Sequence, residues 1–321
     1  HNGHLYHLQQ SKKITGADAA VAVMSGHFLQ RGEPAIADKW ARAEMALRAG
    51  CDLVLELPVA YSAQPAQWFA YGAVAVLNAA GVVDTLCFGS ESGDIEALNT
   101  AAALLADEPG TLAERLDAGL KKGLPYPSAY TAAAQELLAV RGLADLAFSL
   151  EQPNHTLGLH YMIALRQLGS AIVPYTVRRE KSGYSQTDIT DAAIASATAL
   201  RKQLAATGSW DGIAPYVPAS TLDILKREAD AGRAPVDWES FARPLFHALL
   251  RSDAADLAAC AEVTEGLEHR IKRAVTELSD WRVEELLDRL KTKRYTRTKL
   301  QRTLLRILLG HRKENLTTAR L

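Results

Sequence analysis

The chain has 321 residues, of which 48% are apolar and 23% are charged, and its formal net charge is −1. This length predicts two domains, and this composition excludes a disordered chain. The balanced charge gives no sign of a polyanionic partner for the molecule as a whole. The three cysteines are widely spaced, which excludes a disulfide framework and a cysteine zinc site and is typical of a cytoplasmic protein. No apolar run approaches the roughly 18 residues that a membrane-spanning helix needs.

The first 180 or so residues contain short apolar runs separated by helical patterns. Apolar runs at 19–24, 53–58, 82–89 and 171–179 predict buried strands, and helical patterns separate them. This alternation predicts an α/β fold with a Rossmann-like, doubly wound parallel sheet. Because ligands bind at the carboxyl ends of the strands in such sheets, we expect the loops at 25–34, 58–64 and 89–94 at that edge.

Two long stretches of the chain are predominantly helical. Residues 95–150 are rich in Ala and Leu and are interrupted by a proline turn at 123–129, and beyond about residue 208 only helical patterns remain. We therefore predict two domains, an α/β domain over 1–207 and an all-helical domain over 208–321.

The chain opens on HNGH, in which His1 and His4 stand three residues apart at the expected start of a helix. Gly3 lets a nucleotide approach the backbone closely, and the first amides of a helix offer N–H groups and a positive dipole end to a phosphate. Two imidazoles can donate to phosphate oxygens as charge builds on them. The motif predicts a phosphate-handling turn, with two surface histidines on a helix as the alternative.

A second phosphate-binding pattern occurs in IASATALR, residues 194–201. The hydroxyls of Ser196 and Thr198 and the nearby amides can bind phosphate oxygens, and Arg201 can neutralise a leaving pyrophosphate. Alone, the pattern also fits an ordinary alanine-rich helix with a serine N-cap. Its pairing with HNGH, directly after the last predicted strand, favours a nucleotide site.

The two motifs resemble the H-x-G-H and I-S-S-T-x-x-R patterns of the nucleotidylyltransferase superfamily, whose members adenylate with ATP. A closer resemblance spans nearly the whole chain. Residues 25–64, followed in order by FGSESGD, LPYPSA, QPNHTLGLHYMIAL, TVRR and KTKRYTRTKLQR, are similar to the bacterial tRNA(Met) cytidine acetate ligase family. The resemblance implies a sheet of the nucleotidylyltransferase type. Members of this family carry a strand and the residues Y-N-P-F before HNGH, so we expect the first strand to be missing at the start of this chain.

The family resemblance also implies a set of site residues. His1 and His4 are expected to be catalytic, and ATP is expected as substrate, with Mg²⁺ accompanying it. Glu91 and Asp94 could hold that ion through water or could simply cap the next helix. Gln30, Arg31, Lys39 and Arg42 fit phosphate or tRNA contacts as well as solvated faces. The implied ATP-binding residues are His1, Asn2, Gly3, His4, Leu5, Tyr6, His7, Gly89, Asn154, either Arg178 or Arg179, Ser196, Thr198 and Arg201.

A basic run near the end of the chain, Arg289 to Lys313, holds ten Lys and Arg residues and no Asp or Glu. Leucines at helical spacing predict an amphipathic helix within this run, and a tyrosine lies among the charges, where it could stack on a base. A membrane-surface helix and a merely solvated face are the competing interpretations. The predicted tRNA contacts are Lys291, Lys293, Arg294, Tyr295, Arg297, Lys299 and Arg302.

The resemblance implies a reaction in two steps. Acetate and ATP form acetyl-adenylate, and the acetyl group passes to N4 of the wobble cytidine of elongator tRNA(Met), giving N4-acetylcytidine. The expected partners are therefore acetate and that tRNA, and nothing indicates a membrane or a protein partner. A loop at 180–193 is expected to shield the intermediate from water. The alternatives are a small-molecule nucleotidylyltransferase that makes a dinucleotide-type cofactor and a non-catalytic RNA-binding protein.

Overall fold

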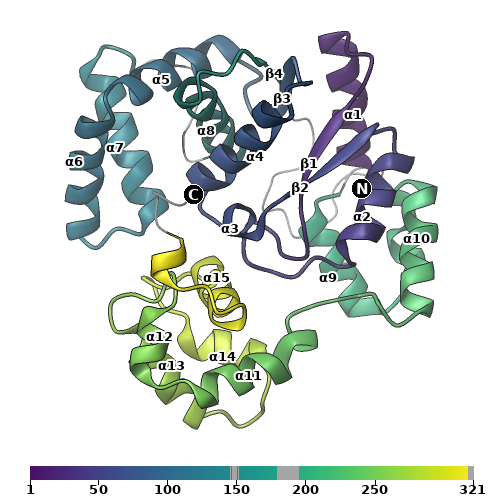
Figure 1. The fold of residues 1–321 in the computed structure, drawn as a ribbon, viewed down its shortest axis with the longest axis vertical. Helices are drawn as coiled ribbons and strands as arrows, with labels where there is room; N and C mark the ends of the chain where they lie inside the picture. The colour runs from purple at the N-terminus through teal and green to yellow at the C-terminus, as the bar shows by residue number, and fades with distance from the viewer. Residues whose placement is uncertain (145, 147–149, 151, 179–194, 317–321) are drawn as a thin grey trace. The chain divides into compact units, whose positions relative to one another are not determined.

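The computed structural model describes residues 1–144, 146, 150, 152–178 and 195–316. Its residues form two compact units (Figure 1). Unit 1 comprises His1–Met24, Trp40–Glu56 and Ala66–Gly232, and unit 2 comprises Ser25–Lys39, Leu57–Pro65 and Arg233–Leu321. None of the described helices has the length and apolarity needed to span a membrane.

The described strands of unit 1 form two pairs. Strand β1 (Val21–Ser25) pairs with β2 (Leu53–Leu57), and β3 (Thr85–Ser90) pairs with β4 (Val173–Arg178). The second pair is parallel, as predicted, with Thr85 opposite Val173 and Ser90 opposite Arg178. All four predicted strands are therefore confirmed, and the fold is α/β with parallel strands. In the described part of the chain, the strands form two separate ladders rather than one continuous sheet.

Helices cover the β3–β4 pair of unit 1 (Figure 1). Helix α1 (Asn2–Thr15) packs against both strands, and α8 (Pro153–Gln167) packs against β3 and against helices α4 and α5. Gly158 allows the close approach of α8, since a Cβ there would lie 2.6 Å from the Phe88 ring. The remaining helices of unit 1 are α2 (Lys39–Arg48), α4 (Ala66–Ala80), α5 (Ile95–Asp107), α6 (Pro109–Lys121), α7 (Tyr126–Val140), α9 (Ala197–Thr207), the 3₁₀ turn η1 (Asp211–Tyr216) and α10 (Ala219–Asp230).

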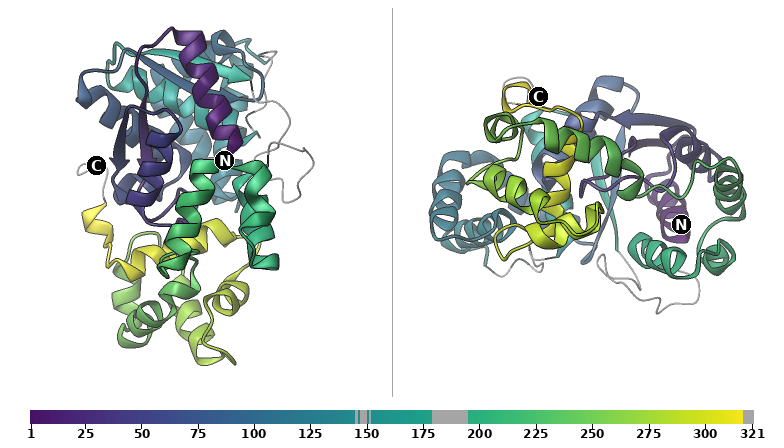
Figure 2. Two further views of the ribbon diagram at one scale, coloured as in Figure 1. Left: turned by 90° about the vertical axis from the view of Figure 1, so that its right-hand side faces the viewer. Right: turned by 90° about the horizontal axis from the view of Figure 1, so that it is seen from below.

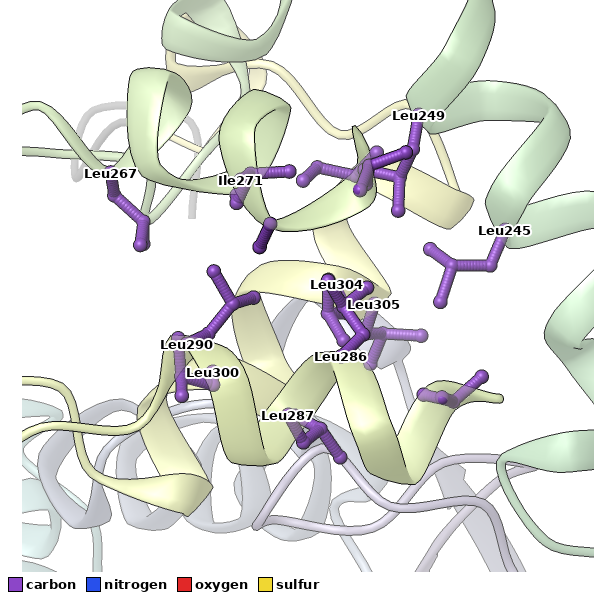
Figure 3. Packing of buried hydrophobic residues seen from close by; sticks show 14 of the residues in the cluster. Leu245, Leu249, Leu267, Ile271, Leu286, Leu287, Leu290, Leu300, Leu304 and Leu305 are labelled. Atoms are coloured by element: carbon purple, nitrogen blue, oxygen red, sulfur yellow. The ribbon is translucent and has the colours of Figure 1, made fainter. Parts of the chain in front are cut away.

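The helices of unit 2 surround a core made largely of leucine (Figure 3). Leu245, Ile271, Leu286, Leu300 and Leu304 are each fully buried there, one or two from each of four helices. The elements of unit 2 are α3 (Val59–Ser62), η2 (Glu239–Phe241), α11 (Ala242–Arg251), α12 (Ala254–Ala259), α13 (Leu267–Thr276), α14 (Val283–Leu290), α15 (Arg297–Leu308) and η3 (Lys313–Asn315).

Two loops from the first half of the chain belong to unit 2. In the 25–39 segment, Phe28 packs its ring against Trp238, with the ring centroids 6.1 Å apart. Gly32 adopts a φ of +80°, and a Cβ there would lie 2.5 Å from the backbone nitrogen of Arg302. In the 57–65 segment, the Ser62 hydroxyl donates to the Phe28 carbonyl. These loops thus contribute to the core of the helical unit.

The compact units follow a different division from the domains predicted at 1–207 and 208–321. Unit 1 continues through α10 to Gly232, and unit 2 takes in the loops that follow β1 and β2. The physical reason lies in apolar side chains such as Phe28 and Ala63, which are buried in the leucine core of unit 2. Of the three loops expected at one sheet edge, only the 89–94 loop belongs to unit 1.

Candidate functional site

The opening motif forms the first turn of α1. The backbone N–H of His4 donates to the His1 carbonyl at 2.9 Å, and the two imidazole rings stack with their centroids 3.9 Å apart. His1, the N-cap residue, makes no side-chain cap hydrogen bond, and this turn lies at the positive end of the helix dipole. The Nδ1 atom of His1 is buried without a hydrogen-bond partner in the part of the chain that the structure describes. This is the arrangement that an anion at the start of α1 would complete.

The other predicted residues of the opening motif lie around this turn. The Asn2 side chain donates to the Pro215 carbonyl at 2.9 Å, which ties the start of α1 to η1. η1 in turn packs against α9, and the Gln203 side chain near the end of that helix donates to the Gly212 carbonyl. Figure 2 shows the same elements of unit 1 from two further directions. Tyr6 is exposed, while Gly3, Leu5 and His7 are half-buried.

The second predicted phosphate motif begins α9. The Ser196 hydroxyl accepts the backbone N–H of Ala199 at 3.0 Å, so it serves as the N-cap. Thr198 is exposed in the first turn, where its hydroxyl and the neighbouring amides can receive phosphate oxygens. The structure thus confirms a helix start at this motif, and the role of its hydroxyls toward a nucleotide stays a prediction.

Two arginines from different helices lie close to each other in unit 1. Burial, and then the positive charge of Arg201 on α9, lower the pKa of Arg42 on α2 to about 10. Two guanidinium groups repel each other, and an anion between them would relieve that repulsion. Arg42 therefore joins Arg201 as a candidate phosphate ligand. The sequence allowed either a phosphate or tRNA contact or a solvated face for Arg42, because it does not show that Arg42 on α2 lies close to Arg201 on α9.

A polar network occupies the carboxyl end of the β3–β4 pair. Ser90, the last residue of β3, accepts hydrogen bonds from the Thr176 hydroxyl at 2.8 Å and from the backbone N–H of Gly93 at 3.0 Å. Gly93 has a φ of +72°, and a Cβ there would lie 2.9 Å from the Cβ of Arg178. The turn after β3 is therefore held in one conformation beside the end of β4.

Glu91 joins this turn to the start of α8. One carboxylate oxygen accepts the backbone N–H and the side-chain Nδ2 of Asn154, at 3.1 and 2.7 Å. The other accepts the backbone N–H of His155 at 2.8 Å. The His155 Nε2 atom in turn accepts the backbone N–H of Ser92, also at 2.8 Å. Asn154 is thereby fixed beside the turn that follows β3, the strand that contains Gly89.

The remaining predicted residues at this edge have simpler positions. Gly89 lies in β3 opposite Val177, and Arg178 is the exposed last residue of β4. Arg179, its competitor for the same role, lies outside the described residues, as does the 180–193 loop that was expected to shield an intermediate.

The carboxylates near this site accept hydrogen bonds from backbone N–H groups. Glu91 caps α8, and Asp94 caps α5 by accepting the N–H of Ala97 at 2.9 Å. Among the described residues there is no group of three His, Cys, Asp or Glu side chains that could hold a metal ion. The residues that the structure describes thus do not form a magnesium site of their own.

In unit 2, the basic run divides into two classes of side chain. The first class is used within the fold. Arg297 donates to both oxygens of Glu284, at 2.5 and 2.8 Å, and Arg302 pairs with Glu262 at 3.0 Å. Arg294 pairs with Glu265 at 2.5 Å.

Tyr295 and Lys299 also belong to this first class. The Tyr295 side chain is only 8% exposed, and its hydroxyl donates to the Glu265 carbonyl at 3.1 Å. Burial lowers the pKa of Lys299. The predicted stacking of Tyr295 on a base does not fit its burial, because the ring lies in the leucine core.

The second class consists of Lys291 and Lys293, which precede α15. Both side chains are exposed. Neither forms an ion pair with any residue that the structure describes, in contrast to the three arginines that follow them. Of the seven predicted tRNA contacts, these two lysines are the ones whose charge the fold leaves available to a phosphate backbone.

Comparisons with known proteins agree with this geometry. Residues 1–320 match the family model described as HIGH Nucleotidyl Transferase. A tRNA(Met) cytidine acetate ligase of Acetivibrio thermocellus is 44% identical over 97% of this chain and 74% of its own length. Another from Caldanaerobacter subterraneus is 42% identical over 96% of this chain and 75% of its own length.

Solved structures give the same result. The crystal structure of apo TmcAL from Thermotoga maritima matches with a TM-score of 0.91 and 36% identity, covering 100% of this chain and 75% of that one. The same protein bound with alpha-thio ATP matches with a TM-score of 0.90 over 100% of this chain and 74% of that one. The chain thus belongs to the HIGH nucleotidyl transferase family and, within it, to the tRNA(Met) cytidine acetate ligases.

Proposed function

We propose that this protein uses ATP to activate acetate as acetyl-adenylate and transfers the acetyl group to N4 of the wobble cytidine of elongator tRNA(Met). The observation that carries the proposal is the start of α1, where the imidazole rings of His1 and His4 stack at the positive end of the helix dipole and the His1 Nδ1 atom is buried without a hydrogen-bond partner among the described residues. This arrangement suits an enzyme that stabilises charge on a phosphate during adenylation. The curated relatives named for the acetate ligation are more than 40% identical over nearly the whole chain.

In the first step, a carboxylate oxygen of acetate attacks the α-phosphorus of ATP. The bond from that phosphorus to the bridging oxygen breaks, and pyrophosphate leaves. His1 and His4 would donate to the α-phosphate oxygens as they gain charge. Arg42 and Arg201, with the amides at the start of α9, would hold the departing phosphates.

In the second step, the exocyclic amine of the cytidine attacks the carbonyl carbon of acetyl-adenylate. The bond between that carbon and the phosphate oxygen breaks, AMP leaves, and the amine loses a proton. A cytosine amine is a weak nucleophile, so the mixed anhydride must be protected from water until the tRNA is bound. We place Lys291 and Lys293 among the groups that bind the tRNA backbone, and we place the reaction in the cytoplasm, where tRNA and ATP are found.

An ATP–pyrophosphate exchange assay with the full-length protein tests this proposal. We expect exchange that requires acetate and that proceeds without tRNA. A small-molecule nucleotidylyltransferase, the alternative that the H-x-G-H motif allows, would instead catalyse exchange with a mononucleotide substrate and would ignore acetate. Complete absence of exchange with either substrate would contradict both functions and favour a non-catalytic RNA-binding protein.

A further inference from the structure

The Asn154 side chain has only one orientation that satisfies its surroundings. Its Nδ2 atom donates to Glu91 at 2.7 Å, and the same carboxylate oxygen accepts the Asn154 backbone N–H at 3.1 Å. A carboxylate only accepts hydrogen bonds, so the amide cannot turn over and place its own oxygen there. Glu91 therefore decides which of the two amide atoms faces away from it.

The atom that faces away is Oδ1, an acceptor. No described residue donates to it, and within the described part of the chain the hydrogen bonds of the Asn154 side chain and backbone N–H go to Glu91. An acceptor recognises N–H or O–H donors. Phosphate oxygens at neutral pH are acceptors too, so Asn154 is not suited to contact the triphosphate.

The start of α8 as a whole is closed to phosphate in the same way. The Glu91 carboxylate accepts the backbone N–H groups of both Asn154 and His155, and its negative charge lies at the positive end of the helix dipole. The starts of α1 and α9 differ, because their N-cap residues are His1 and Ser196, neither of which carries a carboxylate. Unit 1 thus has two helix starts that suit anions and one, at the carboxyl end of β3, that suits a neutral donor.

We propose that Glu91 is a positioning residue that fixes Asn154 with its Oδ1 atom turned toward the nucleoside part of ATP, where it accepts a hydrogen bond from the 6-amino group of adenine or from a ribose hydroxyl. This inference rests on the proposed binding of ATP by unit 1. Ligands of parallel α/β sheets bind at the carboxyl ends of the strands, and Glu91 follows β3 directly. Glu91 itself need not touch the nucleotide.

The decisive variant is Glu91→Gln. Its new amide can donate to Asn154 Oδ1, so Asn154 can turn over and offer Nδ2, a donor, to the nucleoside. We expect the affinity for ATP, measured by equilibrium binding to the full-length protein, to fall about tenfold. Asn154→Ala is expected to cause a loss of similar size. In the double variant the two losses must not add, because Glu91 acts only through Asn154.

Three nucleotides separate the two possible donors. If the 6-amino group of adenine is the donor, the wild-type protein prefers ATP to inosine triphosphate, which carries an acceptor at that position. Glu91→Gln then narrows or reverses this preference, and Asn154→Ala abolishes it. If a ribose hydroxyl is the donor, the wild-type protein instead prefers ATP to 2′-deoxy-ATP or 3′-deoxy-ATP. Asn154→Ala then abolishes that preference. Either pattern supports the proposal and names the group recognised.

Asp94→Asn is the matched control. Asp94 lies three residues after Glu91 and also caps a helix through its carboxylate, but it contacts Ala97 rather than Asn154. Asparagine is as good an N-cap, so we expect ATP affinity to stay unchanged. Denaturant unfolding of each variant shows that it is folded under the binding conditions.

Two results would overturn the inference: wild-type ATP affinity in Glu91→Gln, or additive losses in the double variant. The failure of the proposed function looks different, because the wild-type protein itself would then not bind ATP.

Discussion

The histidines at the start of α1 and the basic run of unit 2 were both predicted from the sequence to bind phosphate groups, but their side chains have different surroundings in the fold. His1 and His4 stack at the start of α1, where His1 makes no side-chain cap hydrogen bond. In the basic run, by contrast, carboxylates of Glu262, Glu265 and Glu284 pair with the arginines. The role of a short motif at a helix start can be predicted from the neighbouring sequence, because the helix itself provides the backbone groups that surround it. The exposed charges of a basic run cannot be predicted in this way, because the carboxylates that pair with them come from other parts of the chain.

The largest effect is expected for Arg306, which belongs to the basic run by sequence and to the core by structure. Its side chain is fully buried, and its guanidinium donates to the backbone carbonyls of Val59 and Ala63. Arg306→Met removes the donors of two carbonyl groups and a charge close to Glu262. We expect the free energy of unfolding to fall by about 3–5 kcal/mol in urea denaturation.

Arg312→Met, at an exposed position in the same run, is the control and is expected to change stability by less than about 0.5 kcal/mol. Unchanged stability of Arg306→Met together with lost tRNA binding would show that Arg306 contacts RNA instead.

The next largest effect is expected for His4 at the start of α1. His4→Ala removes one of the two imidazoles expected to donate to the α-phosphate, and we expect acetate-dependent ATP–pyrophosphate exchange to slow by a factor of about 10²–10³. His269→Ala, an exposed histidine on α13 in unit 2, serves as the matched control and should exchange like the wild type. Equal rates for His4→Ala and the wild type would remove His4 from the catalytic machinery.

A third prediction separates site histidines from core histidines. His160 in α8 is 5% exposed and lies against the ring of Tyr130, with the centroids 4.8 Å apart. Burial lowers the pKa of His160 from 6.5 to about 4. Between these values the unfolded chain binds the proton and the folded chain does not, so stability falls as the pH drops from 6.5 toward 4. The loss reaches about 3 kcal/mol and then levels off.

The measurement is urea denaturation of the wild type and of His160→Leu between pH 4 and 7. The wild type should lose more stability than the variant across this interval, because both share every other titrating group. Parallel pH profiles for the two proteins would mean that His160 keeps its proton in the fold.

The smallest effect is expected at the exposed lysines. Lys291→Glu with Lys293→Glu should weaken tRNA binding about tenfold or more, and the slope of log K against log salt should become shallower by about 2, because two phosphate contacts are lost. Acetyl-adenylate formation should be unaffected. Lys121→Glu with Lys122→Glu, an exposed pair in unit 1, makes the same change in net charge. Equal weakening by both pairs would indicate an effect of net charge and not of a specific surface.

The elements of the fold could be predicted where local patterns decide them. Apolar runs of six to nine residues identified the four strands, which are five or six residues long in the structure. Gly16 and Gly208 end α1 and α9 in the left-handed conformation, a helix end typical of glycine. The assignment of Phe28 and Ala63 to the leucine core of unit 2 could not be predicted, because nothing in the spacing of a polar loop shows which distant core receives its few apolar side chains.

The site could be predicted as a set of residues but not as a set of contacts. The sequence shows that Asn154 lies at a helix start. It does not show that the Asn154 side-chain amide donates to Glu91, which lies more than sixty residues earlier in the chain. The same limit explains Tyr295, whose position among lysines and arginines favours an exposed ring, although the core of unit 2 buries it. Tertiary partners decide both cases, and local pattern does not report them.

The most direct test of the whole account is detection of the modified base. Full-length protein is incubated with elongator tRNA(Met), ATP and isotopically labelled acetate, and the tRNA is digested to nucleosides and examined by mass spectrometry. We predict labelled N4-acetylcytidine at the wobble position, formed only when ATP and acetate are both present. Acetate-dependent adenylation without any labelled cytidine, or labelling that does not require ATP, would contradict the account.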